Sequence, residues 1–240
     1  MKRNFLVVFS AAVVQLAAGP VTFSDGDFNL ANYSAAVTYN PNGITVTNSQ
    51  ILTGGNPNAA IQTILSFTSD FNFAEALIRP TFSYTPSVQG AIATIDTSID
   101  RYLDSNGQAT GSSLGGSWVL LQNGNYYRLT SPGTPLSSTP SYVTHSVTGS
   151  VATDWNLFDF TTGATNTSLH PNFSSSGSQM EFGYTFRLGS VPGIFPGRWD
   201  LRGDNLIYTI NTVPEPNTFL LTGVGVLLAW ATKRLVWQRA

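Results

Sequence analysis

Three aspartates spaced four residues apart, Asp96, Asp100 and Asp104, are the first candidates for chemistry in this sequence. Two carboxylates can serve as the acid and the base of a glycoside hydrolase when they lie about 5 to 9.5 Å apart. On a strand, Asp96 and Asp100 would share a face about 13 Å apart, because each residue advances about 3.3 Å. We therefore interpret these aspartates as solvated charges, and we predict no catalytic residues and no enzyme activity.

The two histidines, His145 and His170, lie in no zinc-binding pattern, and the chain has no cysteine and no G-x-S-x-G motif. Four other residues, in two short segments, are of the types that bind sugars through aromatic faces and planar polar groups: Tyr126, Tyr127, Arg128 and Trp155. Tryptophan and tyrosine also fill the cores of sandwiches, so core packing is the alternative interpretation.

Carboxylates and amides near both ends of the central region are candidate calcium ligands: Asp25, Asp27, Asp204 and Asn205. Ca²⁺ prefers oxygen ligands of these types, and the four residues would converge if the first and last strands were neighbours. One hypothesis is therefore a structural Ca²⁺ site, and no other cofactor is expected. The alternative is that these side chains bond to their own backbone in turns.

The chain of 240 residues begins with a basic Met1-Lys2-Arg3, an apolar run over Phe5–Leu16, and then small residues. This order is typical of a secretory signal peptide, which we place at residues 1–19. Near the other end, Pro214-Glu215-Pro216 precedes an apolar stretch over Thr218–Thr232 and a basic tail. A helix over that stretch would be about 22 Å long, and it could cross a bilayer only with snorkelling flanks or local thinning.

The tripeptide, the short apolar helix at about 218–232 and the basic tail resemble a PEP-CTERM sorting signal at residues 213–240. The resemblance implies processing by an exosortase after transient inner-membrane anchoring. It also implies the surface or matrix of a Gram-negative bacterium that makes exopolysaccharide. Exosortase, the secretion machinery and exopolysaccharide are thus the expected partners. A plain C-terminal membrane anchor is the alternative.

Charged residues make up only 10% of the chain, while hydrophobic residues make up 42%. All 13 acids lie between Asp25 and Glu215 with only six arginines, so this part carries a net charge of −7. A nucleic-acid-binding protein or a coiled coil would need many more charged residues. The composition is typical of a turn-rich, all-β extracellular protein, and no nucleic-acid partner is expected.

Short β-rich runs separated by turn residues fill residues 20–212 and predict a jelly-roll-like β-sandwich of about ten strands. We place these strands at Ala35–Tyr39, Ile44–Thr47, Ala60–Phe67, Glu75–Tyr84, Ala91–Leu103, Ser117–Leu121, Tyr126–Leu129, Tyr142–Thr148, Met180–Leu188 and Asp204–Ile210. Asn123-Gly124 predicts a tight hairpin turn. Ala91–Leu103 could also form a helix, with Ile92, Ile95, Ile99 and Leu103 on one face.

Several short segments of this region resemble those of secreted bacterial jelly-roll domains of laminin-G or lectin-like type. Among them are Gly54-Gly55-Asn56-Pro57 and Trp155-Asn156-Leu157-Phe158. We expect a surface or matrix protein with a structural or adhesive role. The alternative is a carbohydrate-binding module for exopolysaccharide, and a glycan-active enzyme is a third hypothesis. Burial of Trp118, Trp155 and Trp199 would favour the structural role, whereas an exposed row of aromatics would favour sugar binding.

Overall fold

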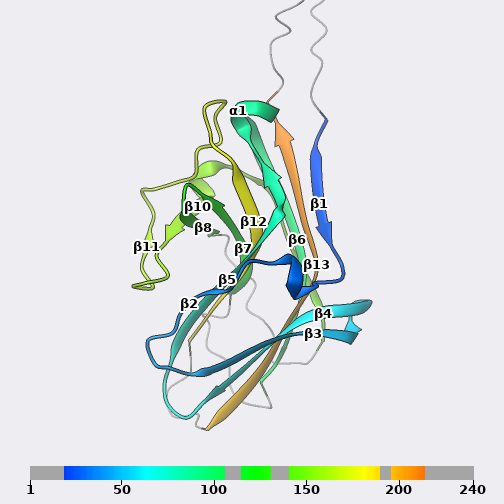
Figure 1. Ribbon diagram of the computed structural model, residues 1–240, viewed down its shortest axis with the longest axis vertical. Coiled ribbons are helices and arrows are strands. Elements are labelled where there is room, and N and C mark those ends of the chain that lie inside the picture. The colour runs from blue at the N-terminus through cyan, green and yellow to red at the C-terminus, as the bar shows by residue number, and fades with distance from the viewer. Residues whose placement is uncertain (1–18, 106–114, 131–140, 190–195, 214–240) are drawn as a thin grey trace, which may run out of the picture. The chain divides into compact units, whose positions relative to one another are not determined.

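Alternating apolar and polar residues build two antiparallel sheets in the computed structural model, which describes residues 19–105, 115–130, 141–189 and 196–213 (Figure 1). The predicted signal peptide, the motif Pro214-Glu215-Pro216 and the helix at about 218–232 lie outside the described residues. No helix within the described part of the chain has the length and hydropathy needed to span a bilayer.

The first sheet has six strands, and β13 lies at its centre. β1 pairs with the second half of β13, β4 pairs with its first half, and β6 runs along its other side. The strands of this sheet are β1 (Val21–Asp25), β3 (Thr45–Gly55), β4 (Asn58–Phe67), β6 (Ile92–Asp104), β9 (Val143–Ser150) and β13 (Gly197–Thr212).

The second sheet has seven strands in the order β11-β10-β8-β7-β12-β5-β2. These are β2 (Val37–Tyr39), β5 (Asn72–Tyr84), β7 (Gly115–Gln122), β8 (Asn125–Leu129), β10 (Trp155–Phe158), β11 (Thr165–Asn166) and β12 (Met180–Gly189). Three single-turn helices complete the described elements: η1 (Leu30–Asn32), α1 (Pro86–Gln89) and η2 (Ala152–Asp154). The predicted all-β sandwich is thus confirmed.

The hairpin predicted at Asn123-Gly124 joins β7 to β8, where Gln122 pairs with Asn125. Both turn residues have positive φ, 53° and 77°, as a two-residue turn with the twist of the flanking strands requires. The ambiguous segment is the strand β6, whose inward side chains include Ile95, Ile99 and Leu103. The sequence analysis did not predict β1, β10 and β11, of which β10 and β11 have only four and two residues.

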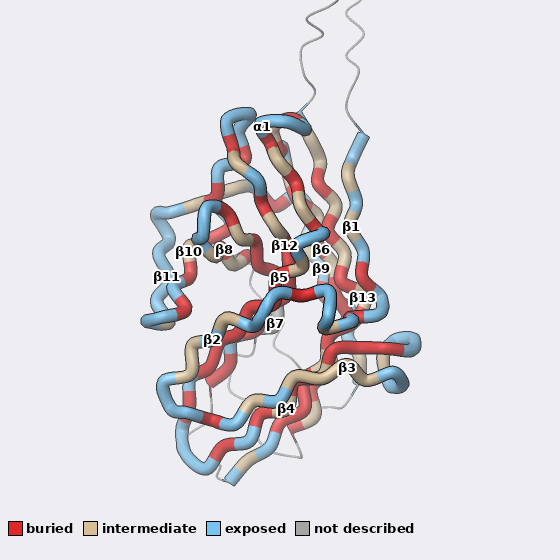
Figure 2. Tube along the Cα trace, viewed as in Figure 1, coloured by how far each residue is buried: buried red, intermediate tan, exposed pale blue. Residues whose placement is uncertain are grey.

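The main core lies between the sheets, and Figure 2 shows buried residues recurring along the paired strands while the connecting loops are exposed. Trp118, Trp155 and Trp199 all belong to it, and none is more than 1% exposed. Burial of each large side chain contributes about 1.5–3 kcal/mol relative to leaving it in water. By the criterion set out above, the buried tryptophans favour a structural role for these three residues.

Glu75 and His145 are among the titratable side chains buried between the sheets. Burial raises the pKa of Glu75 to about 7, although Asn48 donates a hydrogen bond of 2.8 Å to its Oε1 and opposes the rise. Burial, together with the charge of Arg101, lowers the pKa of His145 to about 4. His145 packs its ring 4.8 Å from Trp118. Both groups therefore favour their neutral forms inside the core.

Candidate functional site

The outer face of the seven-stranded sheet carries a second hydrophobic cluster, separate from the main core. Its floor consists of short or branched side chains on the central strands: Ala74, Ala76, Ile78 and Val119. Above this floor, Phe158 and Phe160 meet edge to face with ring centroids 4.7 Å apart, and Tyr126 meets Phe160 at 5.2 Å. Phe158 and Phe160 are buried, while Tyr126 is partly exposed. Tyr126 therefore presents an aromatic side chain that solvent can reach.

The connection between β10 and β11 turns back over this face to its far edge. A Cβ atom on Gly163, whose φ is +70°, would lie 2.6 Å from the ring of Tyr39 on β2. A side chain at this position would therefore clash with the ring, and the backbone conformation also favours glycine. Gly163 thus allows the connection to approach β2, so that Phe160 and Tyr39 border the same face.

Two arginines approach the ring of Phe158. The guanidinium carbon of Arg128 lies 4.9 Å from the ring centroid, and that of Arg187 lies 5.7 Å away, both within the range of a cation–π interaction. Burial, followed by the charge of Arg187, lowers the pKa of Arg128 to about 10. The Nε of Arg128 is buried and donates no hydrogen bond to the described residues. Neither arginine pairs with a carboxylate in those parts of the chain.

One carboxylate, Glu181 on β12, shares this face at the end nearer Tyr126. Burial, followed by the charge of Glu181, raises the pKa of the Tyr126 hydroxyl. Gln179 donates a hydrogen bond of 3.5 Å to Oε1 of Glu181. Asn156 pairs with Arg128 across β10 and β8 and donates to the hydroxyl of Thr130. The face therefore combines aromatic rings, an amide, the carboxylate of Glu181 and two cations that are unpaired within the described residues.

Strand alternation separates the four residues predicted to bind sugar. Tyr126 and Arg128 lie on the outer face, whereas Tyr127, which stands between them on β8, points into the main core and is 8% exposed. Trp155 is fully buried, and its Nε1 donates to the hydroxyl of Ser150 at 3.3 Å. Core packing, the alternative interpretation, therefore describes Tyr127 and Trp155.

Sequence reasoning missed three members of this face: Phe158, Phe160 and Arg187. Alternation gives a usable signal only for Arg187, because the apolar residues of β10 hide the period of two around Phe158. Arg187 stands between the inward-facing Phe186 and Leu188, and Phe158 follows the inward-facing Leu157. No spacing rule links Arg187 to Phe158, because β12 and β10 are separated in the sheet by β7 and β8.

The aspartates Asp96, Asp100 and Asp104 share the outer face of the six-stranded sheet, opposite to the inward Ile95, Ile99 and Leu103. Gly149 donates its backbone N–H to Asp96 at 2.6 Å, and Asn211 donates to the same carboxylate at 3.0 Å. Asn205 donates to Asp100 at 2.7 Å. The common face was predicted correctly, but protein donors bind two of these side chains.

The first and last strands are neighbours, as the calcium hypothesis required, and Asp25 pairs with Leu206. The carboxylate of Asp25 accepts hydrogen bonds from two backbone N–H groups and from Tyr33, and it forms an ion pair with Arg79. This environment, with burial as the largest cause, raises the pKa of Tyr33.

Asp204 accepts hydrogen bonds from the backbone N–H groups of Asn56 and Asn205. Burial raises its pKa despite these bonds. Asp27 is exposed, and the side chain of Asn205 donates to Asp100 and to the carbonyl oxygen of Asn56. Across the described ranges, no three acidic, histidine or cysteine side chains are grouped to hold a metal ion. Only the bonds of Asp25 to the N–H groups of Asp27 and Phe28 and the bond of Asn205 N–H to Asp204 are local, as the turn interpretation expects, whereas Asp204 and Asn205 also bond residues far away in the chain. The Ca²⁺ site stays a prediction.

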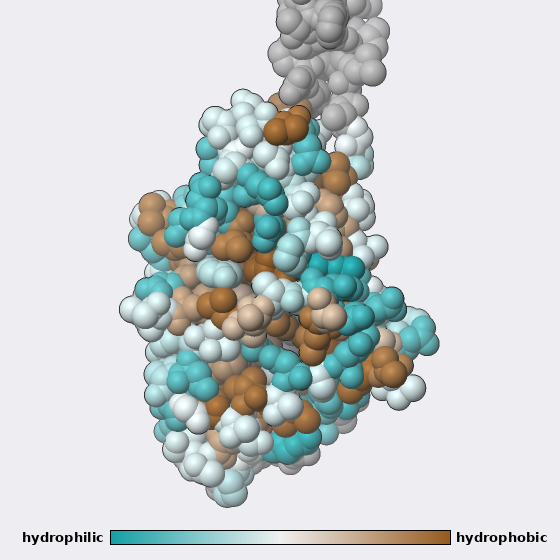
Figure 3. Space-filling model, in the orientation of Figure 1, coloured by the Kyte–Doolittle hydropathy of each residue, from teal (hydrophilic) through white to brown (hydrophobic). Residues whose placement is uncertain are grey.

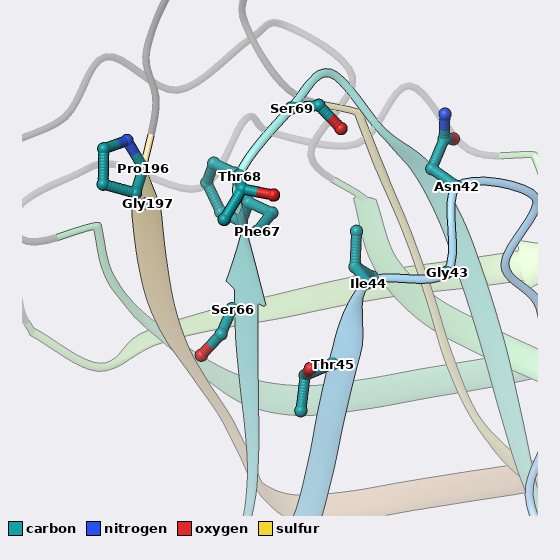
Figure 4. Close-up of a pocket in the computed structure, with 10 residues that line it drawn as sticks. All are labelled: Asn42, Gly43, Ile44, Thr45, Ser66, Phe67, Thr68, Ser69, Pro196 and Gly197. Carbon is teal, nitrogen blue, oxygen red and sulfur yellow. The ribbon is translucent and has the colours of Figure 1, made fainter.

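A pocket of about 300 Å³ lies where the connection before β3, the end of β4 and the start of β13 meet (Figure 4). Its lining includes Asn42, Thr45, Ser66 and Phe67, and none of its ten lining residues carries a charge. On the face shown in Figure 3, hydrophobic residues form small groups separated by polar ones. The pocket offers hydroxyl and amide groups but no titratable side chain.

No family model matches the sequence, and no curated protein matches it. Among solved structures, the chain is similar to a family 11 carbohydrate-binding module from Clostridium thermocellum in complex with a mixed-linked tetrasaccharide. The identity is 14% and the TM-score 0.41, and the match covers 83% of this chain and 99% of that one. The family 11 module of the C. thermocellum cellulase Lic26A-Cel5E is 12% identical at a TM-score of 0.42, covering 84% and 99%. A xylan-binding CBM22 domain from Paenibacillus barcinonensis is 10% identical at 0.34, covering 85% and 99%.

Proposed function

We propose that the described body is a glycan-binding domain whose ligand lies along the outer face of the seven-stranded sheet. The observation that carries this proposal is the arrangement of the partly exposed Tyr126 beside Phe160, with Arg128 and Arg187 over the adjoining ring of Phe158. A sugar ring offers an apolar C–H surface and a rim of hydroxyls. Aromatic rings beside unpaired planar donors complement both parts of that surface.

A purely structural role is the second candidate, because the three body tryptophans are buried and cannot stack on a ligand. The two candidates differ in whether the outer face binds anything. If the domain binds a glycan, the partly exposed Tyr126, which packs on the buried Phe160, takes the role expected of an exposed tryptophan.

A glycan array probed with the full-length protein in mild detergent tests the proposal. We expect binding to at least one polysaccharide class, and Tyr126→Ala should weaken it about tenfold, which corresponds to about 1.4 kcal/mol. The matched control is Tyr102→Ala, which removes a partly exposed tyrosine from the outer face of the other sheet and should leave binding unchanged. If the wild-type protein binds no glycan, the structural role is favoured instead.

Sorting to the cell surface is a separate part of the proposed function, and it rests on the resemblance of residues 213–240 to a PEP-CTERM signal. The last described strand, β13, ends at Thr212, and after Val213 the sequence continues with Pro214-Glu215-Pro216. We expect Glu215→Ala to retain the protein in the inner membrane. Intact mass spectrometry of the released wild-type protein should show loss of roughly 17–19 residues at the front and of the tail from about Pro214. Recovery of peptides from Trp237–Ala240 in that released protein would contradict processing.

A further inference from the structure

The charged side chains on the outer face of the seven-stranded sheet indicate which class of glycan would bind there. We propose that the ligand is an acidic polysaccharide with a ring carboxylate that binds between Arg128 and Arg187. This inference rests on the proposed function, because it assigns a substrate class to the same face. The inference goes beyond the proposed function because it requires a negative charge on the sugar.

The arginines differ in whether they are paired with a carboxylate. Arg79 forms an ion pair with Asp25, and Arg202 bonds both oxygens of Asp200, with Nη2 2.9 Å and Nε 3.2 Å away. Arg128 and Arg187 have no carboxylate partner in the described parts of the chain. Two of the body's few cations are therefore left without a counter-ion on one face.

The two unpaired arginines lie against the same aromatic ring, that of Phe158. Both guanidinium groups contact Phe158, so their positive charges repel each other over a partly desolvated surface. Removing a charge from water is costly unless it is paired and hydrogen-bonded. An anion bound beside the two groups, at the exposed Arg187, would relieve this repulsion. The planar fork of a guanidinium matches a carboxylate especially well.

The aromatic side chains near the two arginines and the charges on the other sheet also favour an acidic polysaccharide. Tyr126 is partly exposed and packs on the buried Phe160, which in turn contacts Phe158, so a sugar ring could stack on Tyr126 near the arginines; this suits a polysaccharide better than a small free anion. The outer face of the other sheet carries five aspartates and two arginines, one of them paired with Asp200: Asp96, Asp100, Asp104, Asp200, Asp204, Arg198 and the paired Arg202. A polyanion would be repelled from that face and directed to the arginines.

The test measures binding of the full-length protein in mild detergent to polygalacturonate and to neutral xylan by isothermal titration calorimetry. We expect polygalacturonate to bind at least about tenfold more tightly, and to lose affinity between about 50 and 300 mM NaCl, because salt screens charge pairs at these concentrations. Arg187→Gln should remove most of the preference for the acidic polymer. Arg187 is exposed, so this variant is expected to fold.

Arg202→Gln is the matched control, because Arg202 also lies over an aromatic ring, 4.4 Å from the centroid of Tyr102, but is already paired with Asp200. This variant should bind both polymers as the wild-type protein does. Arg128→Lys keeps the charge but loses the planar fork, and it should weaken polygalacturonate binding by a larger factor than xylan binding.

The alternative outcomes separate the two proposals. Binding of neither polymer, nor of any array glycan, would overturn the glycan-binding function itself. Equal binding of both polymers, unaffected by Arg187→Gln, would overturn only the acidic class. Polyglutamate or single-stranded DNA binding as tightly as polygalacturonate would also overturn it, because the face would then recognise charge without sugar.

Discussion

On the outer face of the six-stranded sheet, at least four of the five aspartates accept hydrogen bonds from other protein groups, whereas the two arginines on the outer face of the seven-stranded sheet have no carboxylate partner among the described residues. The carboxylate of Asp200, for example, accepts a hydrogen bond of 2.7 Å from Gln62 and another from Arg202. Arg128 and Arg187 share only an aromatic ring. The aspartates are therefore parts of the fold, while the arginines are available to a ligand. The predictions below test this division, beginning with the largest expected effect.

Removing a carboxylate from the network where β1 meets β13 should be the most damaging change. Asp25→Ala leaves Arg79 without its ion-pair partner, and Tyr33 and two backbone N–H groups without an acceptor. Breaking a buried pair in this way typically costs about 3–5 kcal/mol. Urea unfolding measures the loss. Asp27→Ala, at an exposed site in the same turn, should change the free energy of unfolding by less than about 0.5 kcal/mol.

The buried Glu75 should make stability depend on pH. Its folded pKa of about 7 lies above the ordinary 4.5, so the folded state binds the proton more tightly. Stability from this group therefore falls as the pH rises from about 4.5 to 7, in total by on the order of 3 kcal/mol. His145, with a folded pKa of about 4 against 6.5, acts in the opposite direction and gains stability as the pH rises from 4 to 6.5.

The two effects nearly cancel in the wild-type protein, and Glu75→Gln should separate them. The variant keeps an acceptor for Asn48, and its advantage over the wild-type protein should grow between pH 4.5 and 7.5. Urea unfolding at several pH values gives this difference. Glu181→Gln, on the outer face, is the control and should show no such growth. A constant difference for Glu75→Gln would mean that Glu75 is ionised in the core.

Neutralising an unpaired arginine should have a smaller effect, with a sign opposite to that of Asp25→Ala. Arg128→Met keeps a long apolar side chain against Phe158 but removes a partly desolvated charge and its repulsion from Arg187. We expect the free energy of unfolding to stay unchanged or to rise by up to about 1 kcal/mol. Arg202→Met, which removes a paired cation, should lower it slightly. A loss of more than about 2 kcal/mol for Arg128→Met would assign Arg128 to the fold.

Calcium should have the smallest effect. A site at Asp25, Asp27, Asp204 and Asn205 would stabilise the folded protein by about 2.7 kcal/mol at a hundredfold excess over Kd. The carboxylates of Asp25 and Asp204 are already occupied by protein donors, so we expect coincident melting curves in millimolar CaCl₂ and in EDTA. A rise of several degrees in calcium would show that the ion displaces these donors.

Much of the fold follows from the sequence, because strand alternation and turn chemistry are local. Asn123-Gly124 has the residues that a two-residue turn needs, and the alternation of Ile95, Ile99 and Leu103 with aspartates predicts the strand β6 correctly. β10 was missed because it is short, and because Trp155, Leu157 and Phe158 make three of its four residues apolar, which hides the period of two.

The sequence by itself determined that Tyr126 and Arg128 share one face of a strand and that Tyr127 lies on the other, because successive side chains point to opposite sides. Only the tertiary structure decided which side faces water, since aromatic residues occupy both sides of β8. The tertiary structure also decided which charges are paired. Arg79 on β5 forms an ion pair with Asp25, whereas Arg187 on β12 lies beside Phe158 and Arg128. The physical reason is that strand pairing brings together residues far apart in the chain, and no local pattern specifies those neighbours.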